Sequence, residues 1–365
     1  MSDDAQLQRD PPSVGLGLQG GGSHGAFTWG VLDRLLDEVQ ERRLRFAAIS
    51  GASAGAMNAA LCATGLAIGG PAAAKAKLRK FWEDLSRQGF LSGNRFFYGE
   101  PGFFGFNIDW SPIAITLEAM GLIVSPYTNP FYTDPLGPLL QSSFSEADLA
   151  ALNSDKAAPT FVSAVNVGTN ERTIFTQPYL TRDTLRASAC LPTEFRSVRI
   201  GREFYWDGGY MGNPALNPLV DITKDLLLVL VNPFYRRDVP PITSRAILDR
   251  LNEITFNASV VLEVNAIEAV NRALEQAVKE GARPEAMRYK PVRFHAIRDD
   301  KFMATLGFVS KNSTSWTLIE TLFREGWRTA DEWLERNYHK LERESSVDAH
   351  QDLIGPVLKG LRADR

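Results

Sequence analysis

The sequence predicts an α/β fold of three layers, in which helices cover both faces of a mostly parallel central sheet and helical and loop insertions interrupt the pattern. Short apolar runs alternate with longer segments of helical spacing, as in β-α-β units. Residues 225–231, DLLLVLV, are almost continuously apolar, which is typical of a strand buried in mid-sheet. The 365 residues are enough for one large domain with a substantial core.

The first elements predict a β-α-β-turn-α opening. A strand over residues 14–18 is followed by a glycine-rich loop and by a helix over 26–39, and a second strand over 44–49 leads into the turn 50–55. An alanine-rich helix and a third helix over about 72–87 follow. Residues 46–74 contain no charged residue, a length that could cross a bilayer, but they are mostly Ala and Gly. This composition favours a buried strand, turn and helix.

The later elements follow an interruption. Residues 90–138 are rich in aromatic residues, Gly and Pro and have little periodicity, which predicts an insertion of loops and short helices. The expected strands are then 160–167, 172–176, 197–200, 203–206, 225–231 and 291–297, and the expected helices are 182–189, 242–279 (one long or two consecutive) and 316–336. We therefore expect a flexible N-terminus (1–12), a single domain (13–340) and a polar C-terminal tail (341–365).

Composition excludes several classes of partner. Lys and Arg number 40 and Asp and Glu 43, a formal net charge of −3 without a block of like charges, so no nucleic-acid partner is expected. Cys62 and Cys190 lie in small apolar surroundings without metal-ligand spacing, which indicates buried free thiols and no metal site. The first twelve residues are acidic and polar, unlike a secretory signal peptide, which predicts a cytoplasmic protein.

The loop 20–25, GGGSHG, matches G-x-G-x-x-G between a strand and a helix, the context of a dinucleotide-binding fingerprint. That function also needs a carboxylate at the end of the second strand, and residues 48–55, AISGASAG, contain none. A nucleotide-binding oxidoreductase is therefore disfavoured, and no cofactor is expected. The residues alone leave open whether the loop holds a bound phosphate or an oxygen that is negative only while a bond breaks.

Two further motifs supply chemistry. Ser53 lies in a G-x-S-x-G pattern, with Gly51 and Gly55, that places a serine on a sharp turn between strand and helix. Asp207 follows a short strand and precedes two glycines. An Asp-Gly pair alone is an ordinary turn. Beside a candidate nucleophile and a glycine loop without a nucleotide partner, Asp207 becomes a candidate base.

Together these motifs resemble the patatin-like phospholipase family, lipid acyl hydrolases that use a Ser-Asp dyad. Residues 19–25 resemble the family's anion loop, 51–55 its G-x-S-x-G and 207–209 its D-G-[GA], in the same order. Residues 187–216 resemble the bacterial branch, and the likeness extends over about 14–340. Gln19 and His24 depart from the family pattern, which usually has an acidic residue or glycine at the first position and Arg or Lys at the second.

The resemblance implies a patatin-like fold and a serine acyl hydrolase that cleaves carboxyl esters of lipids, of phospholipase A or lysophospholipase type, without a cofactor. Ser53 would be the nucleophile and Asp207 the general base. The oxyanion hole would comprise Gly20, Gly21 and Gly22, with support from His24, Gly25, Gly51, Gly55, Gly208 and Gly209. The expected partner is a lipid ester, with peripheral contact at a membrane as one way to reach it.

Aromatic residues of the insertion could wall an acyl-chain tunnel, contact a bilayer surface or form plain core: Phe90, Phe96, Phe97, Tyr98, Phe103, Phe104, Phe106 and Trp110.

Alternatives remain open for the function and for two histidines. The fold could serve a lipid- or partner-binding protein with little turnover, which the unusual Gln19 and His24 keep open. His295 completes the order Ser53, Asp207, His295 of a Ser-Asp-His esterase, although its mid-strand place favours a structural role. His24 could add a donor to the loop at low pH or could be a surface residue at the start of a helix.

Overall fold

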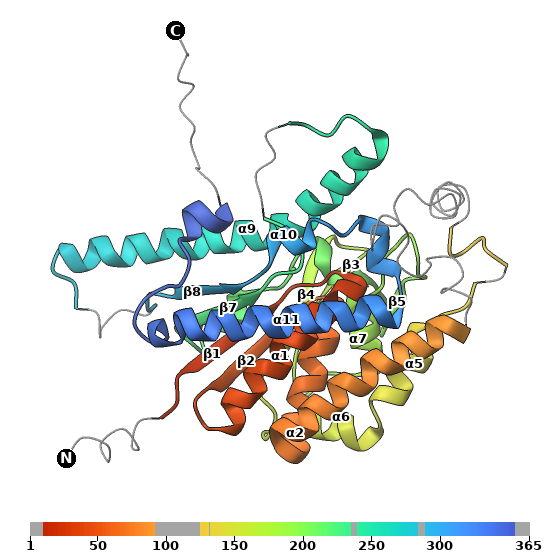
Figure 1. Ribbon diagram of the computed structural model, residues 1–365, viewed down its shortest axis with the longest axis horizontal. Coiled ribbons are helices and arrows are strands. Elements are labelled where there is room, and N and C mark those ends of the chain that lie inside the picture. Colours follow the sequence, from red (N-terminus) through yellow and green to blue (C-terminus); the bar gives the residue numbers. More distant parts are fainter. Residues whose placement is uncertain (1–9, 92–124, 131, 235–238, 284–288, 355–365) are drawn as a thin grey trace, which may run out of the picture.

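A computed structural model describes residues 10–91, 125–130, 132–234, 239–283 and 289–354 (Figure 1). Five parallel strands form the larger part of an eight-stranded sheet, in the order β3-β2-β1-β7-β8, with β8 at one edge. Their bounds are Ser13–Leu18 (β1), Arg45–Gly51 (β2), Thr160–Asn166 (β3), Asp225–Val229 (β7) and Arg293–Ile297 (β8). The predicted mostly parallel α/β fold is confirmed.

Three antiparallel strands extend the sheet beside β3. Strand β6 (Glu203–Asp207) pairs with β3 and carries β5 (Val198–Ile200) on its other side, while β4 (Glu171–Phe175) also pairs with β3. The predicted hairpin around Gly201 is thus β5 and β6, and Gly201 adopts a positive φ of 65° in its turn.

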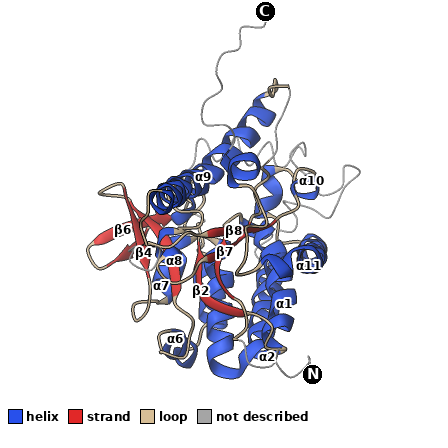
Figure 2. Cartoon of the chain, turned by 90° about the vertical axis from the view of Figure 1, so that its left-hand side faces the viewer, coloured by secondary structure: helices blue, strands red, loops and turns tan. Residues whose placement is uncertain are grey.

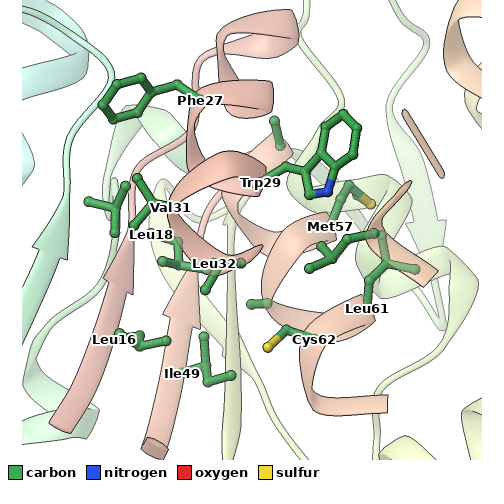
Figure 3. Close-up of a cluster of buried hydrophobic side chains, with 14 of the residues drawn as sticks. Leu16, Leu18, Phe27, Trp29, Val31, Leu32, Ile49, Met57, Leu61 and Cys62 are labelled. Atoms are coloured by element: carbon green, nitrogen blue, oxygen red, sulfur yellow. The ribbon is translucent and has the colours of Figure 1, made fainter. Parts of the chain in front are cut away.

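Helices cover both faces of the sheet (Figure 2). The side chains of β7 alternate: Leu227 and Val229 pack with helices α1 (Gly25–Gln40), α2 (Ala54–Leu91) and α11 (Trp316–Asn337). Leu226 and Leu228 pack with α8 (Asn217–Val220) and α9 (Ser244–Lys279) on the other face. The remaining helices are α5 (Leu136–Ser143), α6 (Glu146–Leu152), α7 (Arg182–Ser188) and α10 (Asp300–Met303). Figure 3 shows the core that β1 and β2 form with α1 and α2.

Helix α2 contains the two helices expected after β2. The backbone is not helical at Gly69 and Gly70, and Pro71, which has no N–H, begins the second part. Residues 54–88 are long and apolar enough to cross a membrane by length and composition, but 56% of the most apolar window is buried in the fold. Cys62 of this helix and Cys190 are buried free cysteines, as predicted.

Two predictions fall partly outside the described residues. The aromatic side chains between residues 90 and 110 are not described, so their role stays a prediction. Residues 341–354 belong to the segment expected as a polar tail, yet Leu341, Ala349 and Leu353 are buried. The last two belong to the short helix η6 (Ala349–Ile354) and pack against α9. The segment is polar on average, so its few apolar residues give no clear periodicity in the sequence.

Candidate functional site

The three motifs meet at one edge of the sheet. The glycine loop follows β1 and Ser53 follows β2, and these strands pair in parallel with Leu18 opposite Gly51. Asp207 ends β6 and pairs with Ala164 of β3, two residues beyond Val162, which pairs with Gly51. Ser53 also lies two residues beyond Gly51. Segments more than 150 positions apart thus arrive at the same level of the sheet.

Ser53 occupies a strained turn between β2 and α2. Its φ is +52°, in the left-handed region that side chains other than glycine rarely adopt. The Ser53 N–H donates to the carbonyl (3.1 Å) and hydroxyl (3.0 Å) oxygens of Ser188 at the end of α7, which fixes the turn. Gly51 and Gly55 pack closely, because a Cβ at Gly51 would lie 2.4 Å from the Gly55 carbonyl oxygen. This is the geometry of a nucleophile elbow, and Ser53 remains 8% exposed.

Asp207 is fully buried, and burial raises the pKa of its carboxyl to about 7. Hydrogen bonding to Gly209 and Ser53 opposes this rise, while the charge of Glu194 adds to it. The Gly209 N–H donates to Oδ1 at 2.7 Å, and Gly208 packs against the backbone of β3. The Ser53 hydroxyl is near enough to favour the ionised carboxylate, but Oδ2 has no hydrogen bond of good geometry among the described residues. Oδ2 is therefore the carboxylate oxygen that is left to accept a proton.

The glycine loop packs directly on Ser53, since a Cβ at Gly20 would lie 2.8 Å from the Ser53 Cβ. The Gly20 N–H donates to Oδ1 of Asn213 at 2.7 Å, so it is not available to an oxyanion. This corrects the expectation that Gly20 supplies a donor. The N–H groups of Gly21 and Gly22 make no hydrogen bond within the described ranges. Gly22 has a φ of +57°, which turns the chain at this point.

Gln19 anchors the loop and explains one departure from the family pattern. Its Oε1 accepts hydrogen bonds from the N–H groups of Val231 and Asn232, both at 2.9 Å, and its Nε2 donates to Oδ1 of Asn257 at 2.9 Å. Only an amide can accept and donate in this way. An acidic residue here would lose the donor to α9 and bury a charge.

His24 is buried, which rules out the alternative of a surface residue at the start of a helix. Its Nε2 lies 2.7 Å from Oγ of Ser310, and this hydroxyl donates to the Gly307 carbonyl oxygen at 2.6 Å. Ser310 must therefore accept a proton from His24, so Nε2 carries the hydrogen. Burial and the nearby charge of Lys311 hold the pKa of His24 well below 6.5. A neutral imidazole that donates to Ser310 does not supply the loop with the low-pH donor considered above.

Gly25 begins α1 beside the site, and its carbonyl oxygen accepts a hydrogen bond of 2.9 Å from Nδ2 of Asn58 in α2.

His295 belongs to a separate cluster. Its Nε2 lies 2.9 Å from Oδ1 of Asp225, which also binds Arg293. Burial raises the pKa of Asp225, but the hydrogen bonds and charges of Arg293 and His295 outweigh it and lower the pKa to about 2. Strand β8 is three strand positions from β2 in the sheet, or about 14 Å at the usual spacing between neighbouring strands. His295 therefore does not form a triad with Ser53 and Asp207, and the structural interpretation holds.

Several residues of the site carry no local sequence signal. Asn213, Asn232, Asn257 and Ser188 hold the loop and the elbow, and each is buried. Asn213 follows the D-G-G motif within six residues, which is the one hint that the sequence offers. Among the described residues, no group of three or more His, Cys, Asp or Glu side chains could hold a metal ion.

The fold and this site define an α/β protein of the serine-hydrolase type, in which a serine elbow and a glycine-rich loop follow neighbouring parallel strands. The family model of patatin-like phospholipases matches residues 16–220, more than half of the 365 residues. The chain belongs to the patatin-like phospholipase family. The match contains the glycine loop, Ser53 and Asp207, so the resemblance inferred from the motifs is confirmed.

Two solved structures are distantly similar. VipD from Legionella pneumophila has 14% sequence identity and a TM-score of 0.36, over 94% of this chain and 73% of that one. ExoU from Pseudomonas aeruginosa, solved in complex with SpcU from the type III secretion system, has 16% identity and a TM-score of 0.30, over 89% of this chain and 53% of that one. Likenesses of this size carry no information about substrate. No curated protein matches the sequence.

Proposed function

We propose that the protein is a serine acyl hydrolase that cleaves carboxyl esters of lipids, of phospholipase A or lysophospholipase type, through a dyad of Ser53 and Asp207. The single observation that carries this proposal is the pairing of a serine at φ +52° with a fully buried carboxyl whose pKa is about 7. A general base is most effective when its pKa is close to the working pH. An exposed aspartate, with a pKa of about 4, would be a much weaker base for a hydroxyl.

In the first half of the reaction, Asp207 accepts the hydroxyl proton while Ser53 Oγ attacks the ester carbonyl carbon. The N–H groups of Gly21 and Gly22 stabilise the oxyanion of the tetrahedral intermediate. Each such donor contributes about 3 to 4 kcal/mol to the rate in related chemistry. The protonated Asp207 then gives its proton to the alcohol oxygen, which leaves as the ester bond breaks.

In the second half, Asp207 accepts a proton from water, and the resulting hydroxide attacks the acyl carbon bound to Ser53. The acid product leaves, and the proton on Asp207 returns to Ser53 Oγ. The base thus serves both halves. Its Oδ1 stays fixed by the Gly209 N–H at 2.7 Å, which leaves Oδ2 for proton transfer.

A fluorophosphonate probe tests the proposal, because it labels only an activated serine. Wild-type protein should be labelled and should hydrolyse p-nitrophenyl esters, and Ser53→Ala should lose both properties. Ser142→Ala, an exposed serine on α5, is the matched control and should behave as wild type. A folded wild-type protein that is neither labelled nor hydrolytic would reject the enzyme and favour the lipid- or partner-binding alternative.

We also propose that the protein is cytoplasmic and contacts a membrane peripherally. Exposed aliphatic residues on α9 support the membrane contact. Ile247, Leu248, Leu251 and Ile254 are 41%, 55%, 53% and 53% exposed and follow one helical stripe. The same helix reaches the site at Asn257, which binds Gln19. Leu248→Asp with Leu251→Asp should weaken binding to phospholipid vesicles more than it lowers hydrolysis of a soluble ester. Unchanged vesicle binding would reject this surface.

A further inference from the structure

One side of the anion loop is covered by a segment that lies outside the family match of residues 16–220. The short helix η4 (Phe308–Asn312) packs on the loop so closely that a Cβ at Gly22 would lie 2.3 Å from the Lys311 carbonyl oxygen. The loop and η4 are therefore in backbone contact at one of the two residues whose N–H groups would form the oxyanion hole.

A hydrogen bond between side chains also joins η4 to the loop, at His24. Nε2 of His24 lies 2.7 Å from Oγ of Ser310, and these residues are 3% and 0% exposed. The Ser310 hydroxyl is itself fixed, because it donates to the Gly307 carbonyl oxygen at 2.6 Å. The bond is thus shielded from water, and its acceptor is held toward the imidazole.

His24 is part of the turn that carries the two N–H groups. Its own N–H donates to the Gly21 carbonyl oxygen at 3.1 Å, which closes the turn. The other end of the loop is held by the bond from Gly20 to Asn213 at 2.7 Å. The two N–H groups therefore lie between two fixed points, and Ser310 holds the second of them.

The bond to Ser310 matters because His24 carries no charge. Burial and the charge of Lys311 hold the pKa of His24 well below 6.5, so the imidazole is neutral at pH 7. The family pattern usually has Arg or Lys at this position, and either would bring several donors. A neutral imidazole has one N–H, and here the Ser310 hydroxyl accepts it. The orientation of His24 therefore depends on that hydroxyl.

We propose that Ser310 is a positioning residue of the oxyanion hole, which it orients by holding His24 from outside the loop. The N–H groups of Gly21 and Gly22 then point to the oxygen that becomes negative when Ser53 attacks, and they need no movement during the reaction. This inference rests on the proposed ester hydrolysis at Ser53. It gives η4, a segment more than 250 positions from the nucleophile, a part in catalysis.

Steady-state hydrolysis of p-nitrophenyl butyrate tests this role. Ser310→Ala should lower kcat at least tenfold and leave KM within twofold of wild type, because an oxyanion hole acts in the transition state and not in substrate binding. The value of kcat is taken per Ser53 labelled to completion by a fluorophosphonate, so unfolded protein does not contribute. Ser313→Ala changes another buried serine, just after η4, and is the matched control that should keep kcat within twofold.

Inhibition by a trifluoromethyl ketone gives a readout that a merely structural change would not move. Ser53 Oγ adds to the ketone carbon while its proton passes to Asp207, and the ketone oxygen becomes an oxyanion in the same hole. The inhibition constant of Ser310→Ala should therefore rise at least tenfold, in parallel with the loss of kcat.

Two changes at His24 test the same bond, also in the case that Ser310→Ala does not fold. His24→Gln keeps an N–H donor close to the position of Nε2, whereas His24→Leu removes it. The value of kcat should be at least fivefold higher in His24→Gln than in His24→Leu. Adding Ser310→Ala to His24→Leu should cause less than a twofold further loss, because the bond is already absent.

The proposal would be overturned by a loss of kcat below tenfold in Ser310→Ala, by a loss that lies mainly in KM, or by an inhibition constant that does not follow kcat. A difference below fivefold between the two His24 variants would overturn it too. So would a further loss of twofold or more in the double variant, because Ser310 would then act by another route.

If wild-type protein is neither labelled nor hydrolytic, the proposed function fails, and hydrogen exchange then tests the hold on the loop by itself. The amides of His24 and Gly25 donate to carbonyl oxygens within the loop. They should exchange at least tenfold faster in Ser310→Ala than in Ser313→Ala. A smaller difference would show that Ser310 does not hold the loop.

Discussion

Replacing Asp207 by asparagine should abolish ester hydrolysis and make the folded protein less sensitive to rising pH. Asp207 is fully buried, and the pKa of its carboxyl is about 7 in the folded state. In the unfolded chain an aspartate has a pKa of about 3.9. The folded state therefore holds a proton at pH values where the unfolded state has released it.

The sign and size of the effect follow from this difference. A raised carboxyl pKa contributes stability at low pH, and this contribution is lost as pH rises from the unfolded pKa to the folded one. Each pKa unit corresponds to about 1.4 kcal/mol, and integration between pH 5 and pH 8 gives a loss of about 2.5 kcal/mol. Asparagine does not titrate. The free energy of unfolding of Asp207→Asn should therefore rise relative to wild type by about 2.5 kcal/mol over that interval.

Urea unfolding of both proteins from pH 5 to pH 8 measures this difference. The pH dependence is the quantity of interest, because the asparagine Nδ2 would occupy the place of an oxygen without a hydrogen-bond partner and would shift stability equally at every pH. Ser53→Ala, which keeps the Asp207 carboxyl, is the control. Its free energy of unfolding should change with pH as in wild type, with the same offset at every pH. Parallel profiles for wild type and Asp207→Asn would refute the assignment of a proton to Asp207. Wild-type kcat/KM should also increase with pH around 7, where the base ionises.

Three further predictions concern the loop and the His295 cluster. Gly22→Ala should destabilise the protein by more than about 1 kcal/mol and lower kcat/KM at least tenfold, because φ is +57° and the new Cβ would meet the Lys311 carbonyl oxygen at 2.3 Å. Gly201→Ala, at φ +65° in open space, isolates the backbone part of that cost, and equal effects of the two changes would contradict the steric argument. His295→Asn should keep ester hydrolysis within tenfold of wild type, and a greater loss of kcat/KM in correctly folded protein would restore the triad. Asp225→Asn should reduce the free energy of unfolding at pH 7 by roughly 2 kcal/mol, because the carboxyl has a pKa of about 2 in the folded protein, below its value in the unfolded chain. The ionised Asp225 therefore stabilises the fold above the unfolded pKa, and this stabilisation is lost as pH falls through the folded pKa. Urea unfolding at pH 7 and pH 3 should therefore show a smaller difference at the lower pH.

The sequence by itself determined the order of the elements and the three motifs. Apolar periodicity placed all of the strands β1 to β8 to within a few residues, because strand and helix periods are local properties of the chain. The G-x-S-x-G pattern located the turn at Ser53, since small residues at Gly51 and Gly55 are what its close packing requires. Family resemblance then supplied the proposed role of Asp207 as the base, which an Asp-Gly pair alone does not indicate.

The tertiary structure decided the chemical state of these residues. Burial sets the pKa of Asp207 and keeps His24 neutral, and burial depends on what every other segment covers. The bond from Gly20 to Asn213 removes one of the three expected oxyanion donors across 193 positions of the chain. Lys311 reaches the loop from the opposite end of the sequence. Such contacts follow from how the sheet is assembled and have no counterpart in local spacing, so only the folded chain reveals them.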